Sequence, residues 1–110
     1  MKLFSALKEI REFQRQQLPF LKTMVDFDIL IEIGYAEEQK QPLTLKQLFL
    51  TNLGSLSSVR RRLVRLEEQG MVKRRANAGD RRSAYLVLTS SCLKMLNRYG
   101  KLLTRISIMG

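Results

Sequence analysis

The chain of 110 residues contains no histidine and only one cysteine, Cys92. These absences exclude a Ser-His-Asp or Cys-His nucleophile, and also a zinc site built from histidine and cysteine within one chain. A lone cysteine cannot form a disulfide within the chain, and it suits a reducing compartment. We therefore expect no catalytic residues, no metal, no cofactor and no enzymatic activity.

A long apolar run is also lacking. The longest stretch without a charged residue, 47–59, contains Gln, Thr, Asn, Gly and three Ser. A membrane-spanning helix needs about 20 mostly apolar residues. Near the N-terminus, the charged residues within 8–12 interrupt any candidate signal peptide. We expect no membrane partner and a cytoplasmic location.

Acidic residues are scarce in the second part of the chain. Residues 1–42 carry 6 basic and 7 acidic side chains, whereas residues 43–110 carry 14 basic and 3 acidic ones. Nine of the basic side chains fall within residues 60–82. Because a surface of mixed charge would serve solubility equally well, this concentration favours a polyanionic partner such as nucleic acid.

Apolar spacing and turn residues predict mostly helices and one β-hairpin. The predicted elements are helices at residues 2–18 and 22–39, a short helix after residue 44, a turn at 52–54, a helix at about 56–69, strands at 71–76 and 83–88, and a final helix from about 90 to 106. This order is that of a winged helix-turn-helix, mainly α with a small β-hairpin. We expect one domain, residues 1–110, with a core at about 22–89 and flanking dimerisation helices at about 1–18 and 90–109.

Several polar residues mark the ends of these helices. Thr44 and Gln47 match the capping box, in which the Thr hydroxyl and the Gln side chain each satisfy a backbone N–H. Ser55 and Thr89 suit the N-cap position of the two helices that follow them. Gly70 suits the left-handed residue that closes the helix at residues 56–69.

The second predicted helix has many apolar residues and a cluster of acids. Its predicted buried face consists of Met24, Phe27, Leu30, Ile31 and Tyr35, broadened by Ile33. The cluster consists of Asp26, Asp28 and Glu32. Without histidine or a recognisable motif, a solvated helix face explains the cluster better than a metal or catalytic site does.

The helix at residues 56–69 has the pattern of a DNA-reading helix. Its core-facing stripe is Val59, Leu63 and Leu66, and Arg61 is at the centre of the opposite side. A groove-reading helix needs short donors near its N-terminus, followed by arginines that can pair bidentately with guanine O6 and N7 or with phosphate. The predicted DNA contacts of this helix are Ser55, Ser57, Ser58, Arg60, Arg61 and Arg65. The alternative is an amphipathic surface helix that carries three consecutive arginines.

The loop of the hairpin contains Gly79, Asp80, Arg81 and Arg82. An arginine at a hairpin tip can enter a narrow, electronegative minor groove, so we predict that Arg81 and Arg82 contact DNA. Phosphates repel an aspartate, so we expect Asp80 to orient the wing by pairing with an arginine. An ordinary turn aspartate is the alternative.

The first and last helices carry further apolar stripes. The predicted dimerisation residues are Leu3, Leu7, Ile10, Leu96, Tyr99, Leu103 and Ile106. A chain of this size has limited interior to absorb both stripes, which favours pairing between subunits over packing on the same domain. A two-fold dimer predicts a pseudo-palindromic operator. For Cys92 we expect a buried, apolar role rather than redox sensing.

Four segments in order resemble the MarR family of bacterial transcriptional regulators. The first three are residues 43–48, 57–67 and 70–74. The fourth is a wing signature at residues 80–83, followed by residues 86–89, where a strand ends in Leu-Thr. The resemblance implies a homodimeric winged-helix DNA-binding protein, usually a repressor and often relieved by a small ligand. It also implies that Arg82 approaches the minor groove and that Asp80 helps to hold the wing.

Together these features predict a sequence-specific regulator of transcription that binds double-stranded DNA as a repressor. Such a protein would be associated with the nucleoid, and the resemblance adds a small-molecule effector of undefined chemistry. The alternative is a winged-helix module for RNA binding, or for protein interaction in replication or plasmid maintenance.

Overall fold

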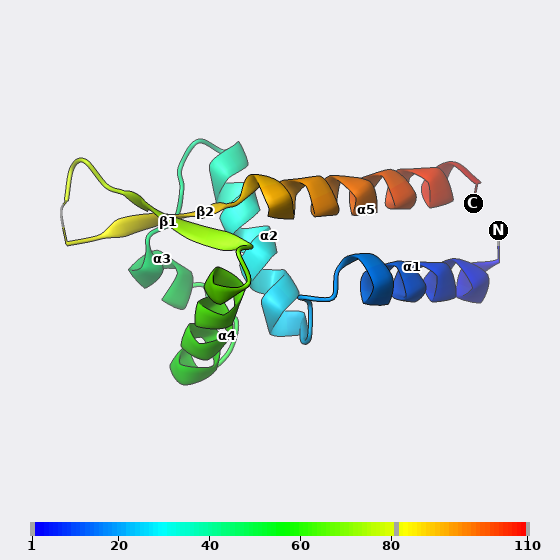
Figure 1. Cartoon of the computed structure of the whole chain (residues 1–110), viewed down its shortest axis with the longest axis horizontal. Coiled ribbons are helices and arrows are strands. Elements are labelled where there is room, and N and C mark those ends of the chain that lie inside the picture. The colour runs from blue at the N-terminus through cyan, green and yellow to red at the C-terminus, as the bar shows by residue number, and fades with distance from the viewer. Residues whose placement is uncertain (1, 81, 110) are drawn as a thin grey trace.

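The computed structural model describes residues 2–80 and 82–109. The elements in chain order are α1 (Leu3–Gln17), α2 (Met24–Glu38), α3 (Leu45–Phe49), α4 (Leu56–Glu68), β1 (Val72–Ala76), β2 (Ala84–Leu88) and α5 (Ser90–Met109). Figure 1 shows the hairpin at one end of the long axis, while α1 and α5 run side by side to the other end, where both termini lie. The winged helix-turn-helix order predicted from the sequence is therefore confirmed, with boundaries that differ by a few residues.

Polar caps define where the helices begin. Thr44 accepts a hydrogen bond from the backbone N–H of Gln47, whose side chain accepts one from the backbone N–H of Thr44, as the capping box predicts. Ser55 accepts from the N–H of Ser58 at the start of α4, and Thr89 accepts from that of Cys92 in α5. The predicted caps are therefore confirmed.

The turn before α4 and the residue that follows α4 both have a left-handed backbone. Gly70 has a φ of 73° directly after α4, as expected for a residue that closes a helix. In the turn between α3 and α4, Asn52 has a φ of 62°, which asparagine tolerates better than most residues. These two residues fix the directions in which the chain enters and leaves α4.

The hairpin is antiparallel and pairs Val72 with Leu88 at its base and Ala76 with Ala84 toward its tip. It is attached to the helical core by the backbone N–H of Leu86, which donates to the carbonyl oxygen of Leu43 at 2.7 Å. The connection between α2 and α3 therefore adds a bond to the edge of β2. This bond holds the base of the wing against the helix-turn-helix pair.

The core forms where α2, α3, α4 and the hairpin meet. Its fully buried residues include the α4 stripe predicted from the sequence, Val59, Leu63 and Leu66. Burial of one large aliphatic side chain contributes about 1.5–3 kcal/mol, so this stripe fixes which side of α4 faces inward. The opposite side of α4, centred on Arg61, therefore faces solvent.

The predicted buried face of α2 is only partly correct. Leu30 and Ile33 are buried as expected, but Met24 is 76% exposed, Ile31 50% and Tyr35 60%, and Ile29, which was not predicted, is completely buried. Apolar residues occur all round α2, so the period of the sequence does not single out one face. The packing of α2 against α4 and β2 decides which face is buried, and leaves the other apolar face open.

The flanking helices α1 and α5 pack on each other within the chain. The Tyr99 ring stacks on Phe13 of α1 at a centroid distance of 5.8 Å and meets Phe27 of α2 edge-on at 5.9 Å. The Gln14 side-chain amide donates to the Tyr99 hydroxyl at 3.0 Å, and Arg105 forms an ion pair with Glu9. In the described part of the chain, no helix is both long enough and apolar enough to cross a membrane.

Candidate nucleic-acid interface

The outer face of α4 presents a small set of polar side chains. Ser57, Arg60 and Arg61 are exposed, whereas Ser58 and Arg65 are half-buried at its borders. Arg61 makes no side-chain hydrogen bond or ion pair within residues 2–80 and 82–109. Its guanidinium keeps its five donors for a partner outside the chain.

Arg62, next to Arg61, has turned inward. Its Nε donates to Oδ1 of Asp26 at 2.7 Å and its Nη2 donates to Oδ2 at 2.6 Å. The backbone N–H groups of Lys22 and Thr23 also donate to Oδ2, at 2.8 and 2.9 Å. Asp26 thus caps α2 and holds α4 at the same time.

Asp26 corrects one prediction made from the sequence. The acidic cluster on α2 was expected to be solvated, but Asp26 is only 1% exposed. Burial raises the pKa of its carboxyl, but hydrogen bonds from Arg62, Lys22 and Thr23 together with the Arg62 charge outweigh burial and hold this pKa below 3.8. The spacing Thr23-x-x-Asp26 signals a capping box, but nothing local signals the partner Arg62, 36 residues away.

Arg60, the third member of the arginine triplet, rests on α3. Its guanidinium carbon lies 5.4 Å from the centroid of the Phe49 ring, within the range of a cation–π contact. The contact leaves the charge of Arg60 exposed but guides the side chain toward α3. Of the three consecutive arginines, Arg61 therefore projects most freely from the middle of α4.

The strands of the wing are fixed by further arginine contacts. Arg74 donates two hydrogen bonds to the Glu67 carboxylate, at 3.0 and 3.1 Å, and these raise the pKa of Arg74. The Arg75 guanidinium lies 5.9 Å from the centroid of the Tyr85 ring. The first pair links β1 to the end of α4, so the hairpin and the candidate reading helix keep a fixed relation.

The tip of the wing is shaped by short polar side chains. The Asp80 carboxylate accepts a hydrogen bond from the backbone N–H of Arg82 at 2.9 Å, which is the contact of a turn aspartate. Asn77 accepts from the N–H of Gly79, and its amide donates to the Ser83 hydroxyl. The side chain of Arg82 is exposed, and Arg81 lies outside the described residues.

A hollow of about 630 Å³ lies between α3 and the wing. The cationic side chains on its lining are Lys46, Arg74 and Arg82, and Asp80 also lines it. Sequence reasoning did not single out Lys46, because one lysine in a short helix carries no pattern. The hollow links the start of the helix-turn-helix pair to the wing by a largely basic surface.

The predicted dimerisation residues divide into two groups. Leu3, Leu7 and Leu103 are exposed, whereas Ile10, Leu96 and Ile106 are half-buried. Tyr99 makes its ring contacts and its hydrogen bond inside the chain, with residues of α1 and α2. The exposed leucines leave apolar surface on the flanking helices α1 and α5, and α2 adds its own open apolar face.

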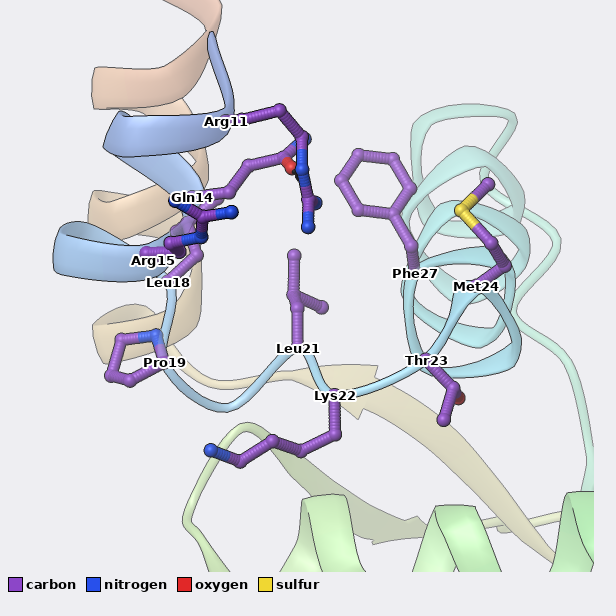
Figure 2. Close-up of a pocket in the computed structure, with 10 residues that line it drawn as sticks. All are labelled: Arg11, Gln14, Arg15, Leu18, Pro19, Leu21, Lys22, Thr23, Met24 and Phe27. Carbon is purple, nitrogen blue, oxygen red and sulfur yellow. Dashed lines mark hydrogen bonds between the residues drawn. The ribbon is translucent and has the colours of Figure 1, made fainter. Parts of the chain in front are cut away.

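A second cavity, of about 530 Å³, lies between α1 and α2. Figure 2 shows Leu21 pointing into it, with Phe27 on the α2 side and Arg11 on the α1 side. Arg15 and Lys22 also line it, so the lining combines apolar side chains with cations. The backbone N–H of Lys22 is one of the donors to Asp26, which connects this cavity to α4.

Cys92 is completely buried in the core near the start of α5. Burial, with a smaller effect of the nearby Glu37 carboxylate, raises the pKa of its thiol to about 11. A thiol reacts as the thiolate, so Cys92 is inert at neutral pH. These properties agree with the predicted role of a small buried apolar residue.

Comparisons with known proteins place this fold in a family. A family model described as MarR family matches residues 21–83, and no curated protein sequence matches the chain. The MepR–DNA complex from S. aureus has a TM-score of 0.75 at 23% identity, covering 97% of this chain and 79% of that one. A cysteine mutant of E. coli MarR complexed with operator DNA has a TM-score of 0.64 at 22% identity, covering 92% and 70%. AbsC, a MarR family regulator from Streptomyces coelicolor, has a TM-score of 0.60 at 21% identity, covering 93% and 71%.

The structural similarities concern the fold, since the identities are low. The family model is the stronger finding, because the residues it matches make up more than half of the chain and include the helix-turn-helix pair, β1 and the loop at the tip of the hairpin. The chain belongs to the MarR family.

Proposed function

We propose that this chain is a transcriptional regulator that binds double-stranded DNA sequence-specifically and represses its target. The observation that carries the proposal is Arg61, exposed and without an internal partner at the centre of the outer face of α4. In this proposal α4 enters the major groove, where a guanidinium reads guanine O6 and N7. The proposed contacts of α4 are Ser55, Ser57, Ser58, Arg60, Arg61 and Arg65.

The wing takes the adjacent minor groove. Arg82 is exposed near the tip, where Asp80 fixes its backbone, and the arginine side chain is suited to a narrow groove of negative potential. We extend the same role to Arg81. MepR and MarR, which share this fold, have been solved with DNA, which supports duplex DNA over RNA or protein as the partner.

Residues 1–110 act as one domain that pairs with a second copy. The exposed Leu3, Leu7 and Leu103 on the flanking helices, and Ile31 on the open face of α2, leave apolar surface that a partner subunit would cover. Two copies related by a two-fold axis present two α4 helices, so the operator is pseudo-palindromic. Such a repressor is associated with the nucleoid.

A small-molecule effector fits the cavity between α1 and α2. Its lining joins Arg11, Arg15 and Lys22 to apolar side chains, which suits an apolar anion. An effector there would act on DNA binding through the backbone N–H of Lys22, which donates to Asp26 and which Lys22→Ala keeps while removing a cationic side chain from the cavity. Release of bound DNA by such an anion, and its loss in Lys22→Ala, would support this role.

The proposed function is tested by selecting bound sequences from a random pool of duplex DNA. The expected result is a pseudo-palindromic consensus, and RNA of matched length should not displace a duplex that contains this consensus from the protein. Arg61→Ala should weaken binding to the consensus more than binding to random DNA, by about 10-fold or more, since a bidentate base contact contributes about 1–3 kcal/mol. Arg98→Ala, which removes an exposed arginine from α5, is the matched control and should leave the preference unchanged.

Equal losses on consensus and random DNA would reduce Arg61 to a phosphate contact. Failure to enrich any sequence, with binding to RNA instead, would favour the RNA-binding alternative.

A further inference from the structure

The outer face of α4 contains one apolar side chain that the core does not use. Val64 is 42% exposed, although Val59, Leu63 and Leu66 of the same helix are buried. A β-branched residue also lowers helix propensity slightly, so Val64 adds nothing to α4 by propensity, and a large part of its surface stays open to solvent. The exposed methyl surface of Val64 is therefore available for contact with a partner of α4.

Val64 lies beside the side chain that most freely faces that partner. It follows Arg61 by three residues, so the two share a face of the helix. Helical side chains lean toward the N-terminus, which brings the Val64 methyl groups back over the turn that carries Arg61. The other two arginines of the triplet are guided away, since Arg62 is held by Asp26 and Arg60 rests on Phe49. Arg61 and Val64 are thus a donor and an apolar group on one surface.

This pair fits two adjacent features of the major groove. Thymine is the base that presents a methyl group there, and guanine presents the two acceptors that arginine reads. Three residues of helix rise about 4.5 Å, and base pairs stack about 3.4 Å apart, so the two contacts fall on base pairs that are one or two steps apart.

We propose that Val64 reads the 5-methyl group of a thymine within one or two base pairs of the guanine read by Arg61. This inference rests on the proposed function and adds to it the composition of the half-site. The consensus should contain thymine and guanine close together in each half. The sequence specificity of α4 then comes partly from an apolar contact with a base, and it does not depend on charged contacts alone.

The test replaces each thymine of the selected consensus by deoxyuridine, which removes only the methyl group. The wild-type protein should lose about threefold to fivefold in affinity at one symmetry-related thymine, the amount expected for one buried methyl group. Val64→Ser should bind the thymine and deoxyuridine duplexes equally well. Val64→Thr, which keeps one methyl, should show an intermediate dependence.

Leu56→Ser is the matched control variant. Leu56 is 53% exposed on the same helix but lies about 80° from Val64, toward the core stripe. It should retain the full dependence on the thymine methyl group. Thermal unfolding monitored by circular dichroism should show that all three variants are folded.

Four outcomes would overturn the inference. A consensus that shows no methyl dependence would remove the thymine contact but leave the proposed function intact. Equal methyl dependence in wild type, Val64→Ser and Val64→Thr, or its loss in Leu56→Ser instead, would assign the contact to another residue. Failure of the wild-type chain to select any duplex would overturn the proposed function, and this inference with it.

Discussion

Asp26 shows how one buried carboxylate can serve two elements at once. It accepts from two backbone donors at the start of α2 and from two guanidinium donors, Nε and Nη2, of Arg62 on α4. A buried charge is tolerable only when it is fully paired, and here four hydrogen bonds complete the pairing. The orientation of α4 is therefore set by a polar contact in addition to its apolar stripe.

Removing the charge of Asp26 should destabilise the fold in a pH-dependent way. At pH 7, Asp26→Asn should lower the free energy of unfolding by about 3 kcal/mol, since it leaves Arg62 without its charged partner. The folded pKa of Asp26 lies below the ordinary 3.8, so its contribution is present above pH 3.8 and disappears as the pH falls through the folded pKa. Urea unfolding at pH 7 and pH 3 measures both effects.

The half-buried neighbour Asp28 supplies the control, because Asp28→Asn removes the same charge from α2 without touching Arg62. A loss in Asp26→Asn that is equally large at both pH values would contradict the proposed electrostatic origin.

At the scale of elements, local signals predicted where helices begin and which side of α4 faces the core. Thr44 and Ser55 cap as expected, because a cap involves residues only three apart in the sequence. The buried face of α2 could be predicted only in part, because its apolar residues surround the helix and the choice depends on contacts with α4 and β2. The pairing of Arg62 with Asp26 could not be predicted for the same reason, since it joins two elements that are far apart in the sequence.

Two glycines should respond with opposite signs to the same substitution. Gly70 has a φ of 73°, and a Cβ there would meet open space, so Gly70→Ala carries only backbone strain. It should lower the free energy of unfolding by about 1–2 kcal/mol. Gly100 lies inside α5 and its Cβ would also meet open space, so Gly100→Ala should raise the free energy of unfolding by about 0.5–1 kcal/mol. Thermal unfolding of both variants gives the comparison, and a change of the same sign would contradict it.

At the scale of the whole molecule, positive charge gathers at the end that carries α4 and the wing. Residues 60–82 hold nine basic side chains, and Figure 1 shows these elements away from the two termini. A protein that neutralises several phosphates releases counterions, so its affinity falls steeply with salt. The candidate site residues could be proposed from the sequence because they follow from a local pattern, whereas the contacts that restrain Arg60 and Arg62 could not.

Arg82→Ala should reduce the slope of log Kobs against log salt concentration by about 1 for each bound wing that loses a phosphate contact. Its fold should be unchanged, because the Asp80 contact uses the backbone of Arg82. Binding titrations at several salt concentrations measure the slope, with Arg98→Ala as the charge control. An affinity and slope equal to those of the wild type would mean that the wing does not dock.

Leu7→Glu should weaken the proposed dimer by placing a charge on the exposed apolar surface of α1. We expect sedimentation to shift toward the monomer and cooperative binding to the full operator to be lost. Leu50→Glu adds the same charge at another exposed leucine, beyond α3, and should leave the association state unchanged. Identical sedimentation of wild type and Leu7→Glu would place the dimer contact elsewhere.

The burial of Cys92 has a practical consequence for following this protein in action. With its only native thiol hidden and un-ionised at neutral pH, maleimide dyes should leave the natural sequence unlabelled. A cysteine introduced at the exposed Ala78 of the wing would then carry a single fluorophore. Energy transfer from that dye to a labelled duplex would time the arrival of the wing, with no background from the rest of the chain.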